Sequence, residues 1–235
     1  MNTTSLRTAD YFDAMYVDNP DPWRFKSLWY EKRKRALTLA CLPAQHYVSG
    51  FEPGCANGEL SAELATRCDR LLCSDGSALA VQAARTHLRD TRNTEVRQLW
   101  LPQEWPDAIT KEVTKKVTKE ERNKDPNEEP KAEPKEVPNN AFDLIVISEV
   151  AYYLSAAQLD DLMRCMMASL TPNGTVVACH WRHQIEGCAL RGDEVHAALA
   201  QGLTLAHLSS HVEPDFRLDV WSRDVRSVAQ REGLA

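Results

Sequence analysis

A loop with two glycines, placed between an apolar run and a segment of helical spacing, constrains this chain more than any other feature. Residues 47–51 are expected to form a short strand, Gly54 and Gly58 allow a tight turn, and residues 59–68 have helical periodicity. A second apolar run then ends at Asp75. Because the helix start offers free N–H groups and a carboxylate at a strand end suits a ribose diol, this order predicts a nucleotide-type cofactor site.

The spacing of the glycines separates two classes of cofactor. A dinucleotide fingerprint has the form G-x-G-x-x-G and seats a pyrophosphate on the helix N-terminus. Here the spacing is G-x-x-x-G and Glu52 precedes it. A carboxylate repels a pyrophosphate but attracts an ammonium group, such as that of S-adenosyl-L-methionine. The loop therefore favours a sulfonium cofactor, with a NAD-type oxidoreductase or a ligand-free turn as alternatives.

The loop and its flanking segments resemble a known family. The E-x-G-x-x-x-G loop and Asp75 resemble those of class I S-adenosylmethionine-dependent methyltransferases. Further segments are similar to the nodulation protein S-like (NodS) branch: 21–25, 30–31, 142–150, 180–181 and 192–196. The resemblance implies an α/β, doubly wound, Rossmann-like, mostly parallel seven-stranded sheet that ends in an antiparallel hairpin. It also implies N-methylation of a glucosamine unit in a chitooligosaccharide. Pro53 departs from the family pattern, because it fixes φ and removes a donor before the loop.

The rest of the chain repeats the alternation of strands and helices. We expect helices at 78–88 and 156–170, strands at 95–100, 142–148 and 175–180, and a β-turn at 171–174. This alternation predicts a parallel sheet covered on both faces. Residues 203–212 and 216–222 flank a Glu-Pro-Asp turn and predict the terminal hairpin.

Composition excludes several classes of protein. A chain of 235 residues with 43% hydrophobic content fits one domain, 1–235, and a net charge of −6 argues against a nucleic-acid partner. The basic run 32–35 is expected on the solvated face of a helix. No apolar run has membrane length and residues 1–14 lack a secretory signal, so we expect no membrane partner and a cytoplasmic location. Seven cysteines without a C-x-x-C pair indicate reduced thiols and no metal site.

Two segments stand apart from the alternating pattern. Residues 111–140 are rich in Lys, Glu, Pro and Asn and predict a charged, mobile insertion, which could recruit a partner. Residues 1–40 carry a cluster of aromatic residues that includes Trp29. These rings could form a lid that keeps water from the cofactor, or they could pack an N-terminal helix against the sheet.

Sites in such a sheet gather at the carboxyl ends of the strands, which selects the candidate residues. The predicted cofactor-binding residues are Glu52, Gly54, Cys55, Ala56, Asn57, Gly58, Asp75, Trp100, Leu101, Ser148, Val150, Trp23 and Tyr30. In this set, Glu52 to Gly58 would hold the methionine moiety, Asp75 the ribose and residues 99–101 the adenine.

The acceptor side is less constrained. A nitrogen nucleophile needs only to be neutral and placed, whereas an oxygen nucleophile needs a base. We expect His180 to be the catalytic base and Glu149 its acidic partner, with His183 and His196 as other candidates. The predicted substrate-binding residues are Tyr152, Tyr153, Arg182, Asp193 and His196. A structural role for each histidine, and a cofactor-binding scaffold without turnover, remain alternatives.

Overall fold

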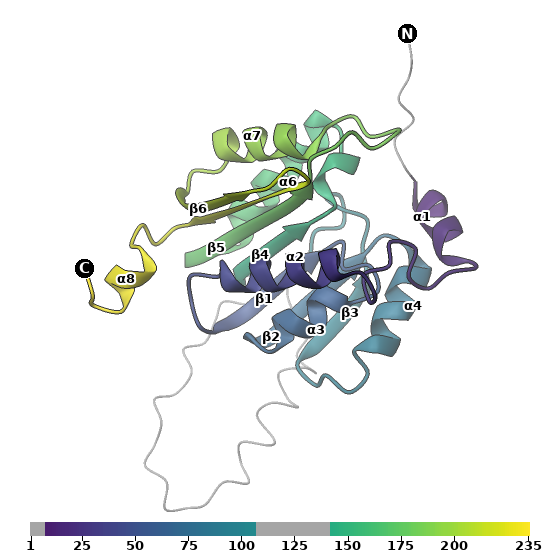
Figure 1. Ribbon diagram of the computed structural model, residues 1–235, viewed down its shortest axis with the longest axis horizontal. Coiled ribbons are helices and arrows are strands. Elements are labelled where there is room, and N and C mark those ends of the chain that lie inside the picture. The colour runs from purple at the N-terminus through teal and green to yellow at the C-terminus, as the bar shows by residue number, and fades with distance from the viewer. Residues whose placement is uncertain (1–7, 107–141) are drawn as a thin grey trace, which may run out of the picture.

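The computed structural model of the protein describes residues 8–106 and 142–235 (Figure 1). Within these residues seven strands form one sheet in the order β3-β2-β1-β4-β5-β7-β6. The strands are β1 (Tyr47–Pro53), β2 (Cys68–Asp75), β3 (Thr94–Gln98), β4 (Phe142–Ser148), β5 (Leu170–Trp181), β6 (Ala206–Val212) and β7 (Phe216–Ser222). The predicted insertion at 111–140 lies outside the described residues.

The strand pairing confirms the predicted fold class. The β3-β2-β1-β4-β5 part of the sheet is parallel, while β7 pairs antiparallel with both β5 and β6. The last two strands are therefore the predicted hairpin, and β7 lies between β5 and β6. The strand order reverses at β1: β2 and β3 follow on one side of β1, and β4 and β5 follow on the other side. A ligand site is expected at such a switch point.

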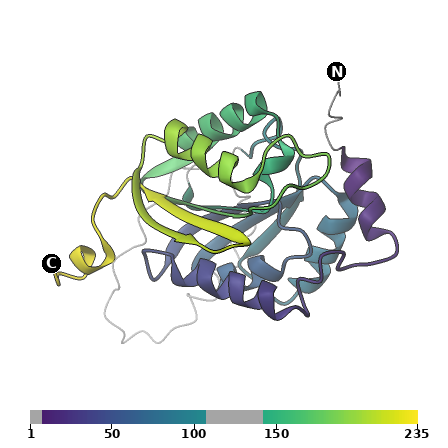
Figure 2. The ribbon, with the colours of Figure 1, turned by 45° about the horizontal axis from the view of Figure 1, so that its top comes forward.

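Helices cover both faces of the sheet, as Figure 2 shows from the side. The described helices are α1 (Ala9–Tyr16), α2 (Trp29–Ala40), α3 (Glu59–Ala65), α4 (Ala78–His87), the 3₁₀ turn η1 (Ala151–Tyr153), α6 (Ala156–Ser169), α7 (Gly192–Gly202) and α8 (Val228–Arg231). Helices α6 and α7 cover one face, and α2, α3 and α4 cover the other. No helix in 8–106 or 142–235 has the length and apolarity needed to span a membrane.

Strand β4 shows why the parallel strands are apolar almost throughout. Its residues Leu144 to Ile147 are fully buried because helices pack on both faces. The exception is Asp143, whose carboxylate accepts hydrogen bonds from the backbone N–H groups of Val48 and Ser49 at 2.7 and 2.8 Å. Two backbone donors of β1 are satisfied in this way, at the point where the β1–β4 ladder starts.

Several boundaries differ from the sequence prediction, and three of the differences have a clear physical reason. Helix α3 ends at Ala65, and β2 already begins at Cys68, the last residue of the predicted helix. Residues 171–174 form no turn, because α6 passes directly into β5 at Leu170 and the chain stays extended. Strand β6 begins at Ala206, since α7 occupies the chain up to Gly202. In each case a tertiary pairing overrides a local preference.

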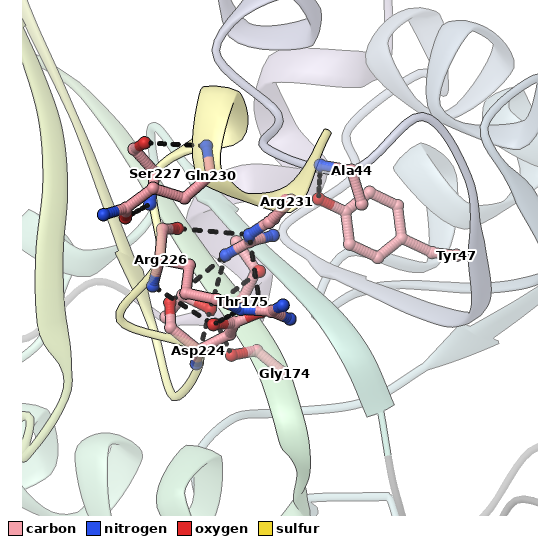
Figure 3. A network of polar contacts seen from close by, with 10 residues as sticks. Ala44, Tyr47, Gly174, Thr175, Asp224, Arg226, Ser227, Gln230 and Arg231 are labelled. Carbon is pink, nitrogen blue, oxygen red and sulfur yellow. Dashed lines mark hydrogen bonds and ion pairs between the residues drawn. The ribbon is translucent and has the colours of Figure 1, made fainter. Parts of the chain in front are cut away.

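The C-terminal helix α8 is tied to the amino ends of the strands by the polar network in Figure 3. Arg231 donates to the backbone carbonyl of Asp224 at 3.2 Å, and the Ser222 hydroxyl donates to the Gly174 carbonyl at 3.3 Å. Arg226 pairs with the Asp224 carboxylate, and its hydrogen bonds lower the pKa of Asp224 to about 2. The network lies at the end of the sheet opposite to the carboxyl ends of β1 and β4, so we assign it to anchoring.

Candidate functional site

A cavity of about 590 Å³ opens at the carboxyl ends of the parallel strands, where the sequence predicts a site. The glycine loop, the ends of β2 and β4, the turn η1 and residues from α1 and α2 contribute to its wall. The predicted residues that line it are Trp23, Glu52, Gly54, Cys55, Ala56, Asn57, Asp75, Trp100, Leu101, Ser148, Glu149, Val150, Tyr152 and Tyr153.

The glycine loop is shaped by close backbone approach. Gly54 has a φ of 73°, and a Cβ added to it would lie 2.8 Å from the Cβ of Val150. Only glycine fits there without strain, because both the left-handed backbone and the contact exclude a side chain. Ala56 also has a positive φ of 50°, and its backbone N–H donates to Asp75 at 3.0 Å. The loop is thus held from the end of β2.

Glu52 lies beneath this loop and is only 2% exposed. Its carboxylate accepts a hydrogen bond of 2.5 Å from the Ser61 hydroxyl of α3. Burial raises the pKa of Glu52 to about 8, although the Ser61 bond opposes the shift. A buried carboxylate of this kind gains from a cationic partner, which would restore the charged form.

Asp75 ends β2 and organises two chain turns. It accepts hydrogen bonds from the N–H groups of Ala56 at 3.0 Å and Ser77 at 2.9 Å. Burial raises the pKa of Asp75, and these backbone bonds oppose the shift. Asp13 of α1 lies nearby and accepts from the Ser77 hydroxyl at 2.5 Å. The N-terminal segment therefore contacts the same corner of the cavity.

The segment around Asp21 fixes the N-terminal residues to the glycine loop. The Asp21 carboxylate accepts from the Phe25 backbone at 2.8 Å and from the Asn57 side-chain amide at 2.9 Å. Trp23 stacks on Phe25 with ring centroids 5.7 Å apart, and both line the cavity. Trp29, by contrast, is 74% exposed and contributes nothing to the wall.

Unsatisfied polar atoms in the wall indicate that a polar ligand belongs in this cavity. Tyr16 and Asn57 both line it, and the Tyr16 hydroxyl and the Asn57 Oδ1 are buried without a hydrogen-bond partner among the described residues. Such orphaned atoms are costly unless a ligand or water satisfies them. Together with Glu52 and Asp75, they fit an amino-acid and ribose-bearing cofactor.

Half of the basic run 32–35 departs from the predicted solvated face, since Lys32 is exposed but Lys34 and Arg35 are buried. Lys34 and Arg35 are only 5% and 8% exposed and both line the cavity wall. Lys34 Nζ lies 2.6 Å from Glu149 and 3.1 Å from Glu31, while Arg35 pairs with Glu63 of α3 at 2.8 Å. Buried cations are tolerated because they meet carboxylates from distant parts of the chain.

Glu149 lies in the wall, as predicted, but its carboxylate is fully engaged. It has a φ of 56° and accepts from Lys34, from the Tyr152 hydroxyl at 2.7 Å and from the Trp181 backbone N–H at 2.9 Å. These three donors hold the turn after β4. Both carboxylate oxygens are engaged by the protein itself, so the geometry favours a positioning role.

His180 does not line the cavity, contrary to the prediction of a catalytic base. The ring is fully buried, and its Nε2 accepts from the Ala151 N–H at 3.3 Å. The proton is therefore on Nδ1, which lies 3.2 Å from His196 Nε2, and His196 Nδ1 donates in turn to Asp219 at 2.5 Å. Burial holds the pKa of His180 well below its usual range. The His180 ring is therefore neutral and enclosed by protein. Its hydrogen bond with Ala151 holds the turn η1 in place.

The other predicted residues that lie outside the cavity wall are Tyr30, Gly58, Arg182, His183, Asp193 and His196. Tyr30 packs edge-on against Trp181, Arg182 pairs with Asp193 at 3.0 Å, and His196 belongs to the buried chain with His180. These contacts dock α2 and α7 on β5, so the residues act behind the wall. Gly58 is absent from the wall as well, because its φ of 84° starts α3 and a Cβ there would face Ala84 of α4 at 3.3 Å.

Sequence reasoning missed several wall residues. These are Met15 of α1, Ile185 after β5, and the charged residues Glu31, Lys34 and Arg35 of α2. No local pattern marks them, since the partners that bury Lys34 and Arg35 come from β4 and α3. One local signal existed for Glu31, which lies in the segment 30–31 that resembles the nodulation branch.

Comparison with known proteins agrees with this geometry. A family model described as "Methyltransferase domain" matches residues 51–176. The curated "Nodulation protein S" of Rhizobium tropici is 25% identical over 176 residues, which are 73% of this chain and 60% of that protein. That of Bradyrhizobium diazoefficiens is 27% identical over 167 residues, 70% of this chain and 65% of that protein. The chain thus spans less than two thirds of these curated relatives.

Two solved structures are similar over most of the chain. The crystal structure of a putative methyltransferase from Pseudomonas syringae is 45% identical, covers 83% of this chain and 99% of its own, and has a TM-score of 0.63. N-methyltransferase NodS from Bradyrhizobium japonicum WM9, in complex with S-adenosyl-L-homocysteine, is 19% identical with a TM-score of 0.69, over 94% of this chain and 98% of its own. The fold, the glycine loop and the match over more than half of the sequence agree, and the chain belongs to the methyltransferase family.

Proposed function

We propose that this chain transfers a methyl group from S-adenosyl-L-methionine to an amine of a small or glycan-like acceptor. The observation that carries the proposal is the placement of Glu52 and Asp75 in the wall of one cavity, together with the glycine loop. One carboxylate suits the ammonium group of the methionine moiety and the other suits the ribose diol. The family match supports methyl transfer over the NAD-type alternative.

The residues that would hold the cofactor follow from the geometry. Glu52 would bind the ammonium group, and Asp75 would bind the ribose hydroxyls while it keeps its two backbone donors. Trp100 and Leu101, which line the same cavity after β3, would cover the adenine. The free atoms of Tyr16 and Asn57 would complete their hydrogen bonds on the ligand.

A bound sulfonium supplies an activated methyl group, so the protein has to position the acceptor and exclude water. Aromatic side chains of the N-terminal segment suit the second task. Phe12 contacts Tyr153 edge-on at 4.9 Å, and Tyr16 contacts Trp23 at 5.6 Å. These rings, all in the cavity wall, join residues 8–40 to the turn after β4. We propose that they form the cover predicted from sequence.

The acceptor is proposed to be an amine. The curated relatives are named nodulation protein S, and the solved NodS is described as an N-methyltransferase. A glucosamine unit in a chitooligosaccharide is therefore the first acceptor to test, with Tyr152 and Tyr153 of η1 placed to frame it. The free cysteines are consistent with a reducing cytoplasm. A partner-binding role for residues 111–140 stays a prediction.

The proposal is tested in two steps. Titration calorimetry with S-adenosyl-L-methionine, S-adenosyl-L-homocysteine and NAD should show binding of the two sulfur ligands only. Radiolabelled methyl donor should then be incubated with glucosamine oligomers, simple amines, alcohols and carboxylates. Label is expected in the amines. Binding without transfer to any acceptor would favour the non-catalytic scaffold, and NAD binding alone would overturn the proposal.

A further inference from the structure

Two carboxylates and one ammonium group form a buried cluster in the cavity wall that the cofactor does not require. Lys34 Nζ lies 2.6 Å from Glu149 Oε1 and 3.1 Å from Glu31 Oε2. The side chains of all three are at most 17% exposed. One ammonium group therefore serves two carboxylates, and one negative charge is left for a cationic ligand.

Neighbouring groups do not supply that missing charge. Arg35, the next cation of α2, is paired with Glu63 at 2.8 Å and also lies 3.7 Å from Glu59. From η1, the Tyr152 hydroxyl donates to Glu149, and burial raises the pKa of Tyr152 well above its usual range, so it stays neutral. From β5, the Trp181 backbone N–H donates to Glu149, and the Cys179 thiol nearby is neutral because burial raises its pKa. Within α2, the Tyr30 ring lies 5.1 Å from Lys34 Nζ and carries no charge. A net negative site thus faces the cavity.

The two carboxylates differ in how firmly they are held. Glu149 has three donors on its two oxygens, whereas the hydrogen bond recorded for Glu31 comes from the shared Lys34 at 3.2 Å. Burial raises the pKa of Glu31, and Lys34 only partly offsets this shift. Burial alone would lower the pKa of Lys34, but Glu149 and Glu31 raise that pKa above its usual value. Lys34 therefore stays protonated, and Glu31, whose recorded donor is the shared Lys34, is the carboxylate with room to engage a ligand.

From this placement we propose that Glu31 binds the acceptor's ammonium group and removes its proton before methyl transfer. The inference rests on the proposed function, because it needs an amine acceptor. Most aliphatic amines and amino sugars are protonated to a large extent near pH 7, and a protonated nitrogen has no lone pair for attack. A carboxylate in the wall of the cavity solves both problems, since it attracts the cation and then accepts the proton.

The atoms balance in two steps. In the first, one N–H bond of the acceptor ammonium breaks, the proton moves to a carboxylate oxygen of Glu31, and the nitrogen keeps the electron pair. In the second, that lone pair forms the N–C bond to the methyl carbon while the carbon–sulfur bond breaks and its electrons stay on sulfur. The product leaves as an N-methylammonium ion with a neutral thioether, and Glu31 then returns its proton to water.

The test compares pH profiles of kcat/KM for wild type, Glu31→Gln and the control Glu63→Gln, with a glucosamine oligomer as acceptor. Glu63 of α3 contacts Arg35 of α2 at 2.8 Å and lies outside the cavity wall. We expect Glu31→Gln to lower kcat/KM about 100-fold or more at pH 7. The loss should shrink with rising pH, because free amine then becomes available. Above the amine's own pKa the wild-type profile should fall, whereas that of the variant should level off.

Each outcome decides one question. Parallel profiles for wild type and Glu31→Gln, or an equal loss in Glu63→Gln, would overturn the proton-acceptor role. Loss of S-adenosyl-L-homocysteine affinity in Glu31→Gln by calorimetry would move Glu31 to the cofactor site and overturn it as well. Wild-type enzyme that binds S-adenosyl-L-methionine but methylates only alcohols or carboxylates would refute the amine acceptor first. Unchanged cofactor binding with an altered profile supports the proposal.

Discussion

Cofactor affinity should rise about tenfold between pH 6 and pH 7, because Glu52 must lose a proton before it can face an ammonium group. Burial raises the pKa of this carboxyl to about 8. At pH 7 about one tenth of the Glu52 side chains are then ionised, and at pH 6 about one hundredth. Each pH unit below the pKa thus weakens binding of a cationic ligand by about 1.4 kcal/mol.

The assay is titration calorimetry with S-adenosyl-L-homocysteine, in two buffers of different ionisation enthalpy at each pH. The difference between the buffers should reveal release of close to one proton per ligand bound at pH 6 to 7. Measurements stay below pH 7.5, because the ligand's own amino group loses its proton near pH 8. Affinity should rise with pH because the ligand binds the ionised form of Glu52. That form is the minor one in the free protein below pH 8, since the pKa of Glu52 is raised.

Two variants sharpen the measurement. Glu52→Gln should bind more weakly and lose the pH dependence, because no group remains to titrate. Ser61→Ala removes the 2.5 Å hydrogen bond that favours the charged carboxylate, so the rise in affinity should move to higher pH. A flat wild-type profile, or an equal slope in Glu52→Gln, would refute the assignment of the ammonium group to Glu52.

The other predictions concern the loop and its supports. Asp75→Ala should weaken S-adenosyl-L-homocysteine binding by about one or two powers of ten, and a nearly unchanged Kd would reject the ribose assignment. Gly54→Ala should lower the free energy of unfolding in urea by about 1 to 3 kcal/mol, because its φ is 73° and its Cβ would meet Val150; full stability would contradict the strain. Asp219→Asn should lower the free energy of unfolding by about 3 kcal/mol above pH 5. Burial favours the neutral acid, but hydrogen bonds from His196, Ser210 and Arg217 outweigh it and lower the pKa of Asp219 below its usual value. That stabilisation is present above the ordinary Asp pKa near 4 and is lost as pH falls below it, so wild type and variant should converge in acid unfolding curves.

Much of the fold could be predicted from local sequence because strand and helix periodicities are regular. The apolar run of β4, the glycine loop and Asp75 each carry their signal within a few residues. Fold class and the cofactor corner follow from them. Helix α7 was not predicted, although its segment contains Gly192 to His196, because its contacts with β5 come from long-range packing.

The acceptor side could not be predicted, for two physical reasons. Adjacent residues of a strand point to opposite faces of the sheet. A shift of one residue along the strand therefore decides whether a side chain enters the cavity. At the end of β5 the cavity receives Trp181, while His180 turns to His196 of α7. Lys34 of α2 is buried against Glu149, which lies 115 residues further along the chain. Neither the register of β5 nor that pairing is visible in a local pattern.

The position of β7 in the sheet has a consequence for how the enzyme is made. A ribosome synthesises β6 before β7, yet β7 is the strand that pairs with β5, and among the described strands β6 pairs with β7 alone. A nascent chain that ends at β6 therefore lacks β7, the strand that β6 joins in the described sheet. Asp219 of β7 also supplies the last partner for the histidines that hold the Ala151 turn. The cofactor corner can form early in synthesis, while the acceptor side is completed only when the last strand has been translated.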